Sequence, residues 1–276
     1  MNEDRISEIL KKARQKEERP AKGAASSRLA ALKAFFAQFK TPSGLSYIAE
    51  KKDDTGIDPR VVAYYAPNSP VSEQYRILRT HLFASKPEAP PKTVILTSSQ
   101  AGEGKTLTAI NLAVTLARDS HKNVLLIDAD LRKGQINKIM NLPLEVGLAG
   151  VLSGNSEIDG VIQKSRISGL SVIASGTKPS NPAELLGQAK MKELLNYLKG
   201  SYDHLILDVP PLISVTDGQV LAPLAEGIIL VIKAESTRLE VIQHAQFLIQ
   251  QAKGKVIGYV LSNVEYHIPE YIHKYL

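Results

Sequence analysis

The feature that most constrains what this chain can fold into is the short stretch SSQAGEGKT at residues 98–106. The apolar run TVILT, residues 93–97, comes directly before it. A helical pattern follows it, with small and apolar residues at spacings of three and four: Ile110, Ala113, Leu116 and Ala117. This order predicts a strand, a glycine loop and a helix that buries one face and points its positive end at an anion in the loop.

The stretch matches the phosphate-binding pattern G-x-x-x-x-G-K-[ST] except at its first position, where Ser99 replaces glycine. In such a loop the backbone N–H groups point at an anion, the lysine adds positive charge near the outer phosphates, and the last hydroxyl can ligate Mg²⁺. An unliganded glycine turn would leave the agreement of strand, loop and helix unexplained. We therefore expect ATP and Mg²⁺ to bind here, with the nucleotide held by Gly102, Glu103, Gly104, Lys105, Thr106 and Leu107.

Carboxylates follow two further apolar runs. The run VLLI leads into Asp128, with Asp130 two residues on, and the run HLIL leads into Asp208. Ligands of open parallel sheets bind beyond the carboxyl ends of the strands, so we predict Thr106, Asp128 and Asp208 as Mg²⁺ ligands. A single aspartate at a strand end is more often a helix cap or a turn residue. Several aspartates beside one phosphate loop favour a metal site.

Strand and helix patterns alternate through the rest of the chain. Further strands are expected at residues 170–173, 228–232 and 256–261, and helices near 185–199 and 238–252. Asn181 and Pro182 are expected to begin a helix, as cap and first residue. The alternation predicts an α/β fold, a P-loop NTPase with a mostly parallel sheet flanked by helices on both faces.

Charge and composition divide the 276-residue chain into three parts. Residues 1–60 carry 13 Lys and Arg against 9 Asp and Glu, so most of the net charge of +6 lies near the N-terminus. We expect a basic, flexible, partly helical arm at 1–56, a nucleotide-binding domain at 57–263 and a tail at 264–276. The arm fits either a solvated tether or a docking arm for an acidic membrane surface or membrane protein. Without a base-stacking aromatic array, we expect no nucleic acid partner.

Cysteine is absent, which excludes a disulfide framework and thiol chemistry. No signal-peptide pattern begins the chain, and no apolar run approaches the ~18 residues of a membrane-spanning helix. We therefore expect a cytoplasmic protein that contacts the inner face of the membrane through a partner.

A helical pattern starting near residues 68–72 precedes the phosphate loop. Its apolar side, expected to face the core, has Ile77, Leu78 and Leu82. Its charged stripe has Glu73, Arg76 and Arg79 at spacings of three. On spacing alone this stripe is explained by solvated ion pairs, which contribute little to stability.

The last 11 residues contain three of the ten tyrosines, Tyr266, Tyr271 and Tyr275. These tyrosines lie beyond the last predicted strand, where no length of chain is left to build further core. One alternative is a short helix that packs the tyrosines and Ile272 back onto the sheet. The other is an exposed tail open to modification.

The motifs resemble those of the cytoplasmic catalytic domain of the bacterial tyrosine kinases of polysaccharide synthesis and export. In that family the phosphate loop is followed by D-x-D-x-R, which Asp128, Asp130 and Arg132 match. Related ATPases of chromosome partitioning and division-site placement typically have a lysine where this chain has Gln100, which favours the kinases. Ala101 stands where the kinases usually have proline.

The resemblance implies an ATP-dependent protein-tyrosine autokinase that phosphorylates its own tail in trans. The implied catalytic residues are Lys105, Asp128, Asp130 and Arg132, the implied acceptors are Tyr266, Tyr271 and Tyr275, and the implied contacts with neighbouring subunits are Glu73, Arg76 and Arg79. Free tyrosine has a pKa of about 10 and aspartate one of about 4, so early proton removal is unfavourable. Asp128 or Asp130 is therefore expected to orient the phenol and accept its proton late, while Arg132 stabilises the phenolate.

The resemblance also implies that Asn263 contacts the base and that the chain associates with itself and with a separate membrane protein, a chain-length determinant that activates it. Lys178 is either a phosphate-side residue or a surface lysine, and we favour the surface lysine. Two other functions stay open. One is a partitioning-type switch ATPase, and the other is a nucleotide-dependent scaffold of the export complex.

Overall fold

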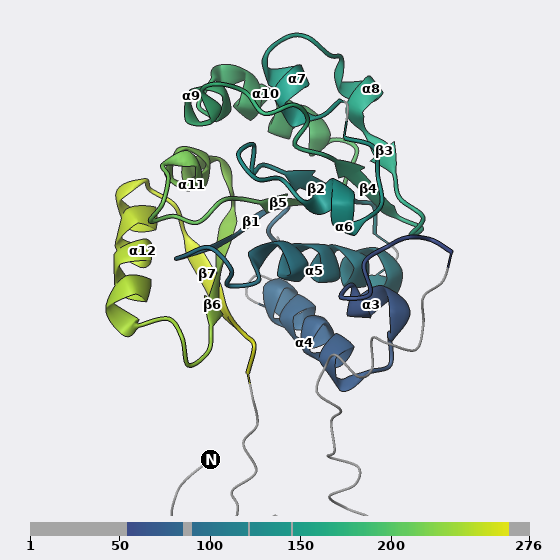
Figure 1. The fold of residues 1–276 in the computed structure, drawn as a ribbon, viewed down its shortest axis with the longest axis vertical. Coiled ribbons are helices and arrows are strands. Elements are labelled where there is room, and N and C mark those ends of the chain that lie inside the picture. The colour runs from purple at the N-terminus through teal and green to yellow at the C-terminus, as the bar shows by residue number, and fades with distance from the viewer. Residues whose placement is uncertain (1–53, 85–89, 121, 145, 265–276) are drawn as a thin grey trace, which may run out of the picture. The chain divides into compact units, whose positions relative to one another are not determined.

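A seven-stranded β-sheet forms the centre of the computed structural model (Figure 1). The strands lie in the spatial order β3-β4-β2-β5-β1-β6-β7, and neighbours are parallel except for β3 and β4. Their bounds are β1 Thr93–Ser98, β2 Val124–Asp128, β3 Gln163–Lys164, β4 Leu170–Ile173, β5 His204–Asp208, β6 Gly227–Lys233 and β7 Val256–Ser262. The predicted mostly parallel sheet is confirmed, and each predicted strand lies within one of these.

The structure describes residues 54–84, 90–120, 122–144 and 146–264. All of them belong to one unit of the chain, Ser43–Glu265. Residues 1–53 of the predicted arm lie outside the described residues, as do Tyr266, Tyr271 and Tyr275. Within the described ranges, no helix is long and apolar enough to cross a membrane.

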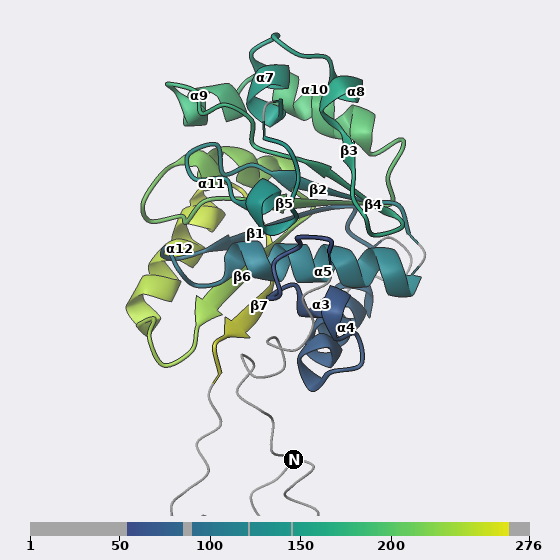
Figure 2. The same ribbon diagram turned by 45° about the vertical axis from the view of Figure 1, so that its right-hand side comes forward.

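Two clusters of buried side chains lie on opposite faces of the sheet. Because side chains alternate along a strand, Ile95 of β1 belongs to one cluster while Val94 and Leu96 belong to the other. The Leu96 cluster includes α3 Val62–Tyr65, α4 Pro70–Ala84, α5 Lys105–Ser120 and α6 Ile136–Ile139. The Ile95 cluster includes α7 Leu148–Leu152, α8 Ile158–Val161, α9 Pro182–Leu186, α10 Ala189–Leu198, α11 Asp217–Leu221, the 3-10 helix η1 Ala222–Leu224 and α12 Leu239–Gln251. Figures 1 and 2 show α4 and α5 across the sheet from α7 and α10.

Helix α5 is buried over more of its surface than the single predicted face. Every residue from Thr108 to Ala117 is buried, because the sheet covers one side of the helix while α3 and α4 cover the other. The buried Asn111 side chain on this helix has partners across the interface. Asn111 Oδ1, for example, accepts a hydrogen bond from the Ala63 N–H at 2.9 Å.

The single helix predicted near residues 185–199 is wrong, because the structure has two helices, α9 and α10. The Gly187 N–H donates to the carbonyls of Ala183 and Glu184 at 3.0 and 3.1 Å, which closes α9. Gln188 then adopts an extended conformation (φ −68°, ψ 151°) and α10 begins after it. A change of backbone conformation at Gln188 therefore separates the two helices.

Two side-chain predictions are also wrong. Pro182 begins α9 as expected, but Asn181 does not cap its backbone, since the Asn181 amide donates to the Glu184 carboxylate at 3.0 Å. In α4, Leu82 is buried but Ile77 is 41% exposed. Leu78 and Leu82 are four residues apart and share the face toward α5, whereas Ile77 lies about 100° around the helix.

The region between Arg132 and β4 contains α6, α7, α8 and the short edge strand β3, none of which was predicted. These helices have four or five residues each. Such lengths are too short to show the periodic pattern by which a helix is recognised in sequence.

The strand order brings the predicted site residues to one edge of the sheet. β5 lies between β2 and β1, and Asp128 at the end of β2 is in register with Asp208 at the end of β5. The phosphate loop follows β1. The carboxyl ends of these three adjacent strands therefore carry the loop and both aspartates, as predicted.

Candidate functional site

The phosphate loop joins β1 to α5 and requires glycine at two points. Gly102 and Gly104 have φ angles of +83° and +91°, a conformation that residues with a Cβ rarely adopt. A Cβ added at Gly102 would meet no atom within 4 Å, so the backbone is open to a ligand there. Helix α5 begins at Lys105, so its free N–H groups and its positive end lie at the loop.

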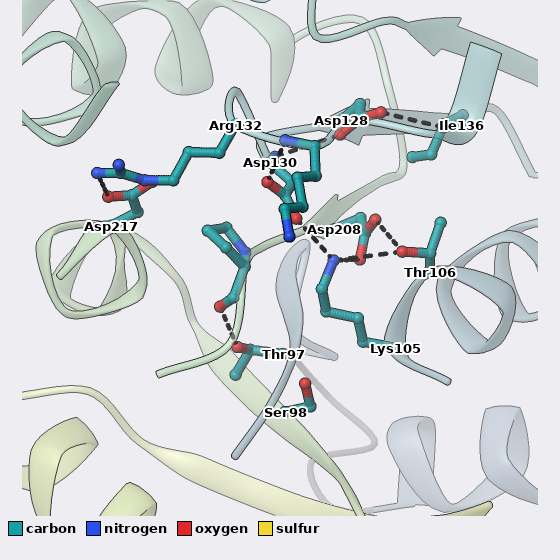
Figure 3. A network of polar contacts seen from close by, with 12 residues as sticks. Thr97, Ser98, Lys105, Thr106, Asp128, Asp130, Arg132, Ile136, Asp208 and Asp217 are labelled. Carbon is teal, nitrogen blue, oxygen red and sulfur yellow. Dashed lines mark hydrogen bonds and ion pairs between the residues drawn. The ribbon is translucent and has the colours of Figure 1, made fainter. Parts of the chain in front are cut away.

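Lys105, Thr106, Asp130 and Asp208 meet where the central strands end (Figure 3). The Lys105 ammonium lies 3.1 Å from an Asp130 oxygen and 3.3 Å from an Asp208 oxygen. The Thr106 hydroxyl donates a hydrogen bond to the other Asp208 oxygen at 2.7 Å. The structure therefore brings these four predicted residues into direct contact.

Asp128 is fully buried at the same edge. Its two carboxylate oxygens accept hydrogen bonds from the N–H groups of Asp130, at 3.2 Å, and Ile136, at 3.1 Å. Burial, with the nearby charge of Asp208, raises the pKa of Asp128 to about 8. Burial also raises the pKa of Asp208. The Asp128 carboxyl group therefore keeps its proton up to about neutral pH.

At Lys105, burial and the neighbouring charges act on the pKa in opposite directions. Burial acts to lower the pKa of its ammonium, but the charges of Asp208 and Asp130 outweigh burial, so the pKa is raised. The lysine is the counter-charge of this cluster of acidic groups.

Arg132 forms an ion pair with a residue that the sequence analysis did not identify. Its Nε and Nη2 each donate to an oxygen of Asp217 at 2.9 Å. Asp217 is fully buried and is the first residue of α11. Figure 3 shows this pair apart from Lys105. Asp217 was missed because neither a strand end nor a motif identifies it.

Glu103 points into the protein rather than toward the open side of the loop. Its side chain is buried, and one carboxylate oxygen accepts the Gln100 N–H at 2.8 Å while the other accepts the Thr237 hydroxyl. The Ser262 hydroxyl donates to the Glu103 carbonyl at 2.6 Å. Thr237 and Ser262 are far from the loop in sequence, and no motif identified them.

The predicted subunit-contact residues on α4 form ion pairs with each other and with α5. Arg76 lies 2.9 Å from both Glu73 and Asp119, and Arg79 lies 3.0 Å from Asp119. The side chains of Arg76 and Arg79 keep 27% and 20% of their surface exposed. Their contact with a neighbouring subunit stays a prediction.

The three remaining predicted residues differ in their exposure. Leu107 is partly buried and packs against the Leu96 cluster. Asn263 is exposed, has a φ of +57° and follows Ser262, which contacts the loop. Lys178 is exposed, as a surface lysine would be.

The oxygen atoms at this edge suit a hard cation. Thr106 and Asp208 supply a hydroxyl and a carboxylate in contact with each other, and Mg²⁺ is typically bound by one or two such groups, with phosphates and waters completing its shell. Among the described residues, no group of three or more His, Cys, Asp or Glu side chains forms a metal cage. The residues therefore fit a nucleotide-bound Mg²⁺ rather than an all-protein site.

Comparison with known proteins agrees with this geometry. Residues 91–257 match the family described as AAA domain. The chain is 41% identical over 202 residues to the tyrosine-protein kinase YwqD of Bacillus subtilis (strain 168), covering 73% of this chain and 85% of that one. It is 34% identical to the tyrosine-protein kinase CapB of Staphylococcus aureus, named as putative, covering 72% and 86%. Its fold matches the kinase domain of the Escherichia coli tyrosine kinase ETK with a TM-score of 0.72 and 28% identity, covering 84% and 89%.

Proposed function

The chain belongs to the bacterial tyrosine-protein kinases, and we propose that it transfers the γ-phosphate of ATP, with Mg²⁺, to its own tail tyrosines in trans. The acceptors in this proposal are Tyr266, Tyr271 and Tyr275. The observation that carries it is the contact of Lys105 and Thr106 with Asp130 and Asp208 at the phosphate loop. This arrangement supplies a cation, a hydroxyl and carboxylates beside backbone donors for phosphate.

The roles of the side chains follow from their environments. Thr106, Asp208 and the fully buried Asp128 are the proposed metal ligands, directly or through water. Mg²⁺ bound there would neutralise phosphate charge. Lys105 exchanges its ion pairs with Asp130 and Asp208 for the phosphates. Phosphoryl transfer needs positioning and charge stabilisation more than covalent help.

Asp130 is the proposed partner of the acceptor phenol. It is slightly exposed, whereas Asp128 is fully enclosed, and it becomes free to accept a hydrogen bond once Lys105 turns to the nucleotide. The phenol gives its proton to the Asp130 carboxylate late in the transfer, because the phenol pKa of about 10 lies well above that of an ordinary carboxylate. Arg132, held by Asp217, follows Asp130 by two residues and is proposed to help stabilise the phenolate.

The proposed setting is the cytoplasmic side of the membrane, where a separate chain-length-determinant protein activates the kinase during synthesis and export of an exopolysaccharide. The support is the resemblance of the D-x-D-x-R segment and the phosphate loop to that family. Neighbouring copies of the chain would meet through the α4 face formed by Glu73, Arg76 and Arg79. No nucleic acid takes part in this proposal.

The test is intact mass spectrometry of the purified chain after incubation with Mg-ATP, with and without the activator's cytoplasmic fragment. We expect mass gains in steps of one phosphate, confined to the C-terminal peptide. Lys105→Met should reduce the rate at least about a hundredfold, the scale for removing one donor that stabilises developing charge. Steady release of phosphate without labelled tyrosine would instead indicate a switch ATPase, and nucleotide binding without either reaction would indicate a scaffold.

A further inference from the structure

Glu103 is the one carboxylate in the phosphate loop, and its side chain is only 3% exposed. A charge this deeply buried is costly unless hydrogen bonds compensate it. Both oxygens have partners, since one accepts the Gln100 N–H at 2.8 Å and the other accepts the Thr237 hydroxyl. The carboxylate therefore links Gln100, inside the loop, to Thr237, outside it.

The first of these hydrogen bonds lies within the loop. Gln100 and Glu103 are three residues apart, and the bond between them closes the turn that carries Gly102. A bond across a loop removes alternative backbone conformations, so the N–H groups that would cradle phosphate are held in one arrangement. The Glu103 side chain thus restrains the loop backbone from inside the protein.

The second bond joins the loop to a distant segment. Thr237 lies between β6 and α12, outside the phosphate motif. Its own N–H donates to the Lys233 carbonyl at 3.2 Å, which fixes it at the end of a central strand. The loop is therefore linked to the end of β6, which pairs with β1 on the side opposite β5.

A third contact reaches the end of β7. The Ser262 hydroxyl donates to the Glu103 carbonyl at 2.6 Å, and a Cβ on Gly104 would lie 3.4 Å from the Ser262 Cβ. Strand β7 thus packs directly on the loop. The described chain ends two residues later at Val264, where the segment with the three tail tyrosines begins.

We propose that Glu103 is a positioning residue, which holds the phosphate loop in its nucleotide-binding shape through Thr237 and Ser262. This rests on the proposed nucleotide binding at the loop and assigns Glu103 a role other than ligand contact. It also makes two residues outside the motif, Thr237 and Ser262, determinants of nucleotide affinity. Thr237 acts through the Glu103 carboxylate, and Ser262 acts through the Glu103 backbone carbonyl.

The experiment is titration of the full-length chain and its variants with a fluorescent ATP analogue and Mg²⁺. Glu103→Ala should weaken binding at least tenfold. Glu103→Gln should restore much of it, because its carbonyl can accept one bond and its amide can donate to the Thr237 oxygen. Thr237→Val and Ser262→Ala should each weaken binding several-fold. Ser236→Ala, an exposed neighbour in the same segment as Thr237, is the matched control and should bind like wild type.

The double variant Glu103→Ala/Thr237→Val separates positioning from a general loss of structure. If Thr237 acts through Glu103, the double variant binds no more weakly than Glu103→Ala alone. Fully additive losses, or Glu103→Ala and Thr237→Val binding like wild type, would overturn the inference while leaving the proposed function standing. A wild-type chain that binds no nucleotide would overturn the proposed function itself. Melting temperatures identify any variant that is unfolded. If Glu103→Ala is unfolded, nucleotide binding by Thr237→Val tests the positioning role instead.

Discussion

Strands β1 and β7 differ in burial although both end beside the phosphate loop. β1 lies between β5 and β6, and all six of its residues are buried. β7 forms one edge of the sheet, and none of its seven residues is fully buried, with Leu261 62% exposed. The groups proposed for the chemistry thus follow closely packed central strands, whereas the proposed acceptor segment follows the edge strand. The central strand is therefore enclosed along its whole length, whereas the edge strand is not.

Truncating one leucine in each strand should give the largest difference, measured as the free energy of unfolding. Leu96→Ala in β1 removes a fully buried side chain and should lower the free energy of unfolding by about 2–5 kcal/mol. Leu261→Ala in β7 should change it by no more than about 0.5 kcal/mol, as for most exposed positions. Urea titrations of both variants give the two values. Comparable losses would show that the edge is as closely packed as the centre.

The pH dependence of stability tests the buried charge at the end of a central strand. Between about pH 4 and pH 8 the native protein keeps a proton on Asp128 that the unfolded chain has released. The free energy of unfolding should therefore fall as pH rises through this range, by up to about 1.4 kcal/mol per pH unit. Asp128→Asn should remove that contribution.

The measurement is the pH dependence of urea unfolding in EDTA, compared between wild type and Asp128→Asn. Asp203→Asn is the control, because the N–H of Asn123 lowers the pKa of the Asp203 carboxyl. Its contribution to stability is lost only as the pH falls through that lowered pKa, so the control should keep the wild-type slope from pH 5 to 8. Parallel slopes for wild type and Asp128→Asn would contradict the buried-charge account.

The smallest expected effect is on self-association, which the proposal requires because the tail of one copy is phosphorylated at the site of another. Replacing Glu73, Arg76 and Arg79 by alanine should weaken self-association and reduce tail phosphorylation several-fold at low protein concentration, with nucleotide affinity unchanged. Asp119→Ala is the control. It removes the α5 carboxylate that pairs with Arg76 and Arg79, and it leaves the three α4 side chains in place. Sedimentation across a dilution series gives the association. Unchanged sedimentation of the triple variant would remove this face from the mechanism.

The sequence was sufficient to predict the features that depend on local pattern. The strand, loop and helix around Lys105 and the placing of Asp128 and Asp208 at one edge follow from apolar runs and parallel-sheet topology. Contacts between distant segments could not be predicted in this way. Arg132 pairs with Asp217, and Glu103 with Thr237, because tertiary packing brings together residues that no spacing relates. The break at Gln188 likewise depends on one backbone conformation inside a continuous helical pattern.

Transfer between two full-length chains tests the central claim most directly. One chain carries Tyr266, Tyr271 and Tyr275 all changed to Phe, so it keeps the nucleotide site but offers no tail acceptor. The other is Lys105→Met, which keeps the tyrosines but lacks the lysine of the loop. After mixing with Mg-ATP and activator fragment, intact mass spectrometry should show phosphate on the Lys105→Met chain alone, at a rate that increases with the concentration of its partner. A Lys105→Met chain that stays unmodified in the mixture, while wild type becomes phosphorylated alone, would contradict transfer in trans.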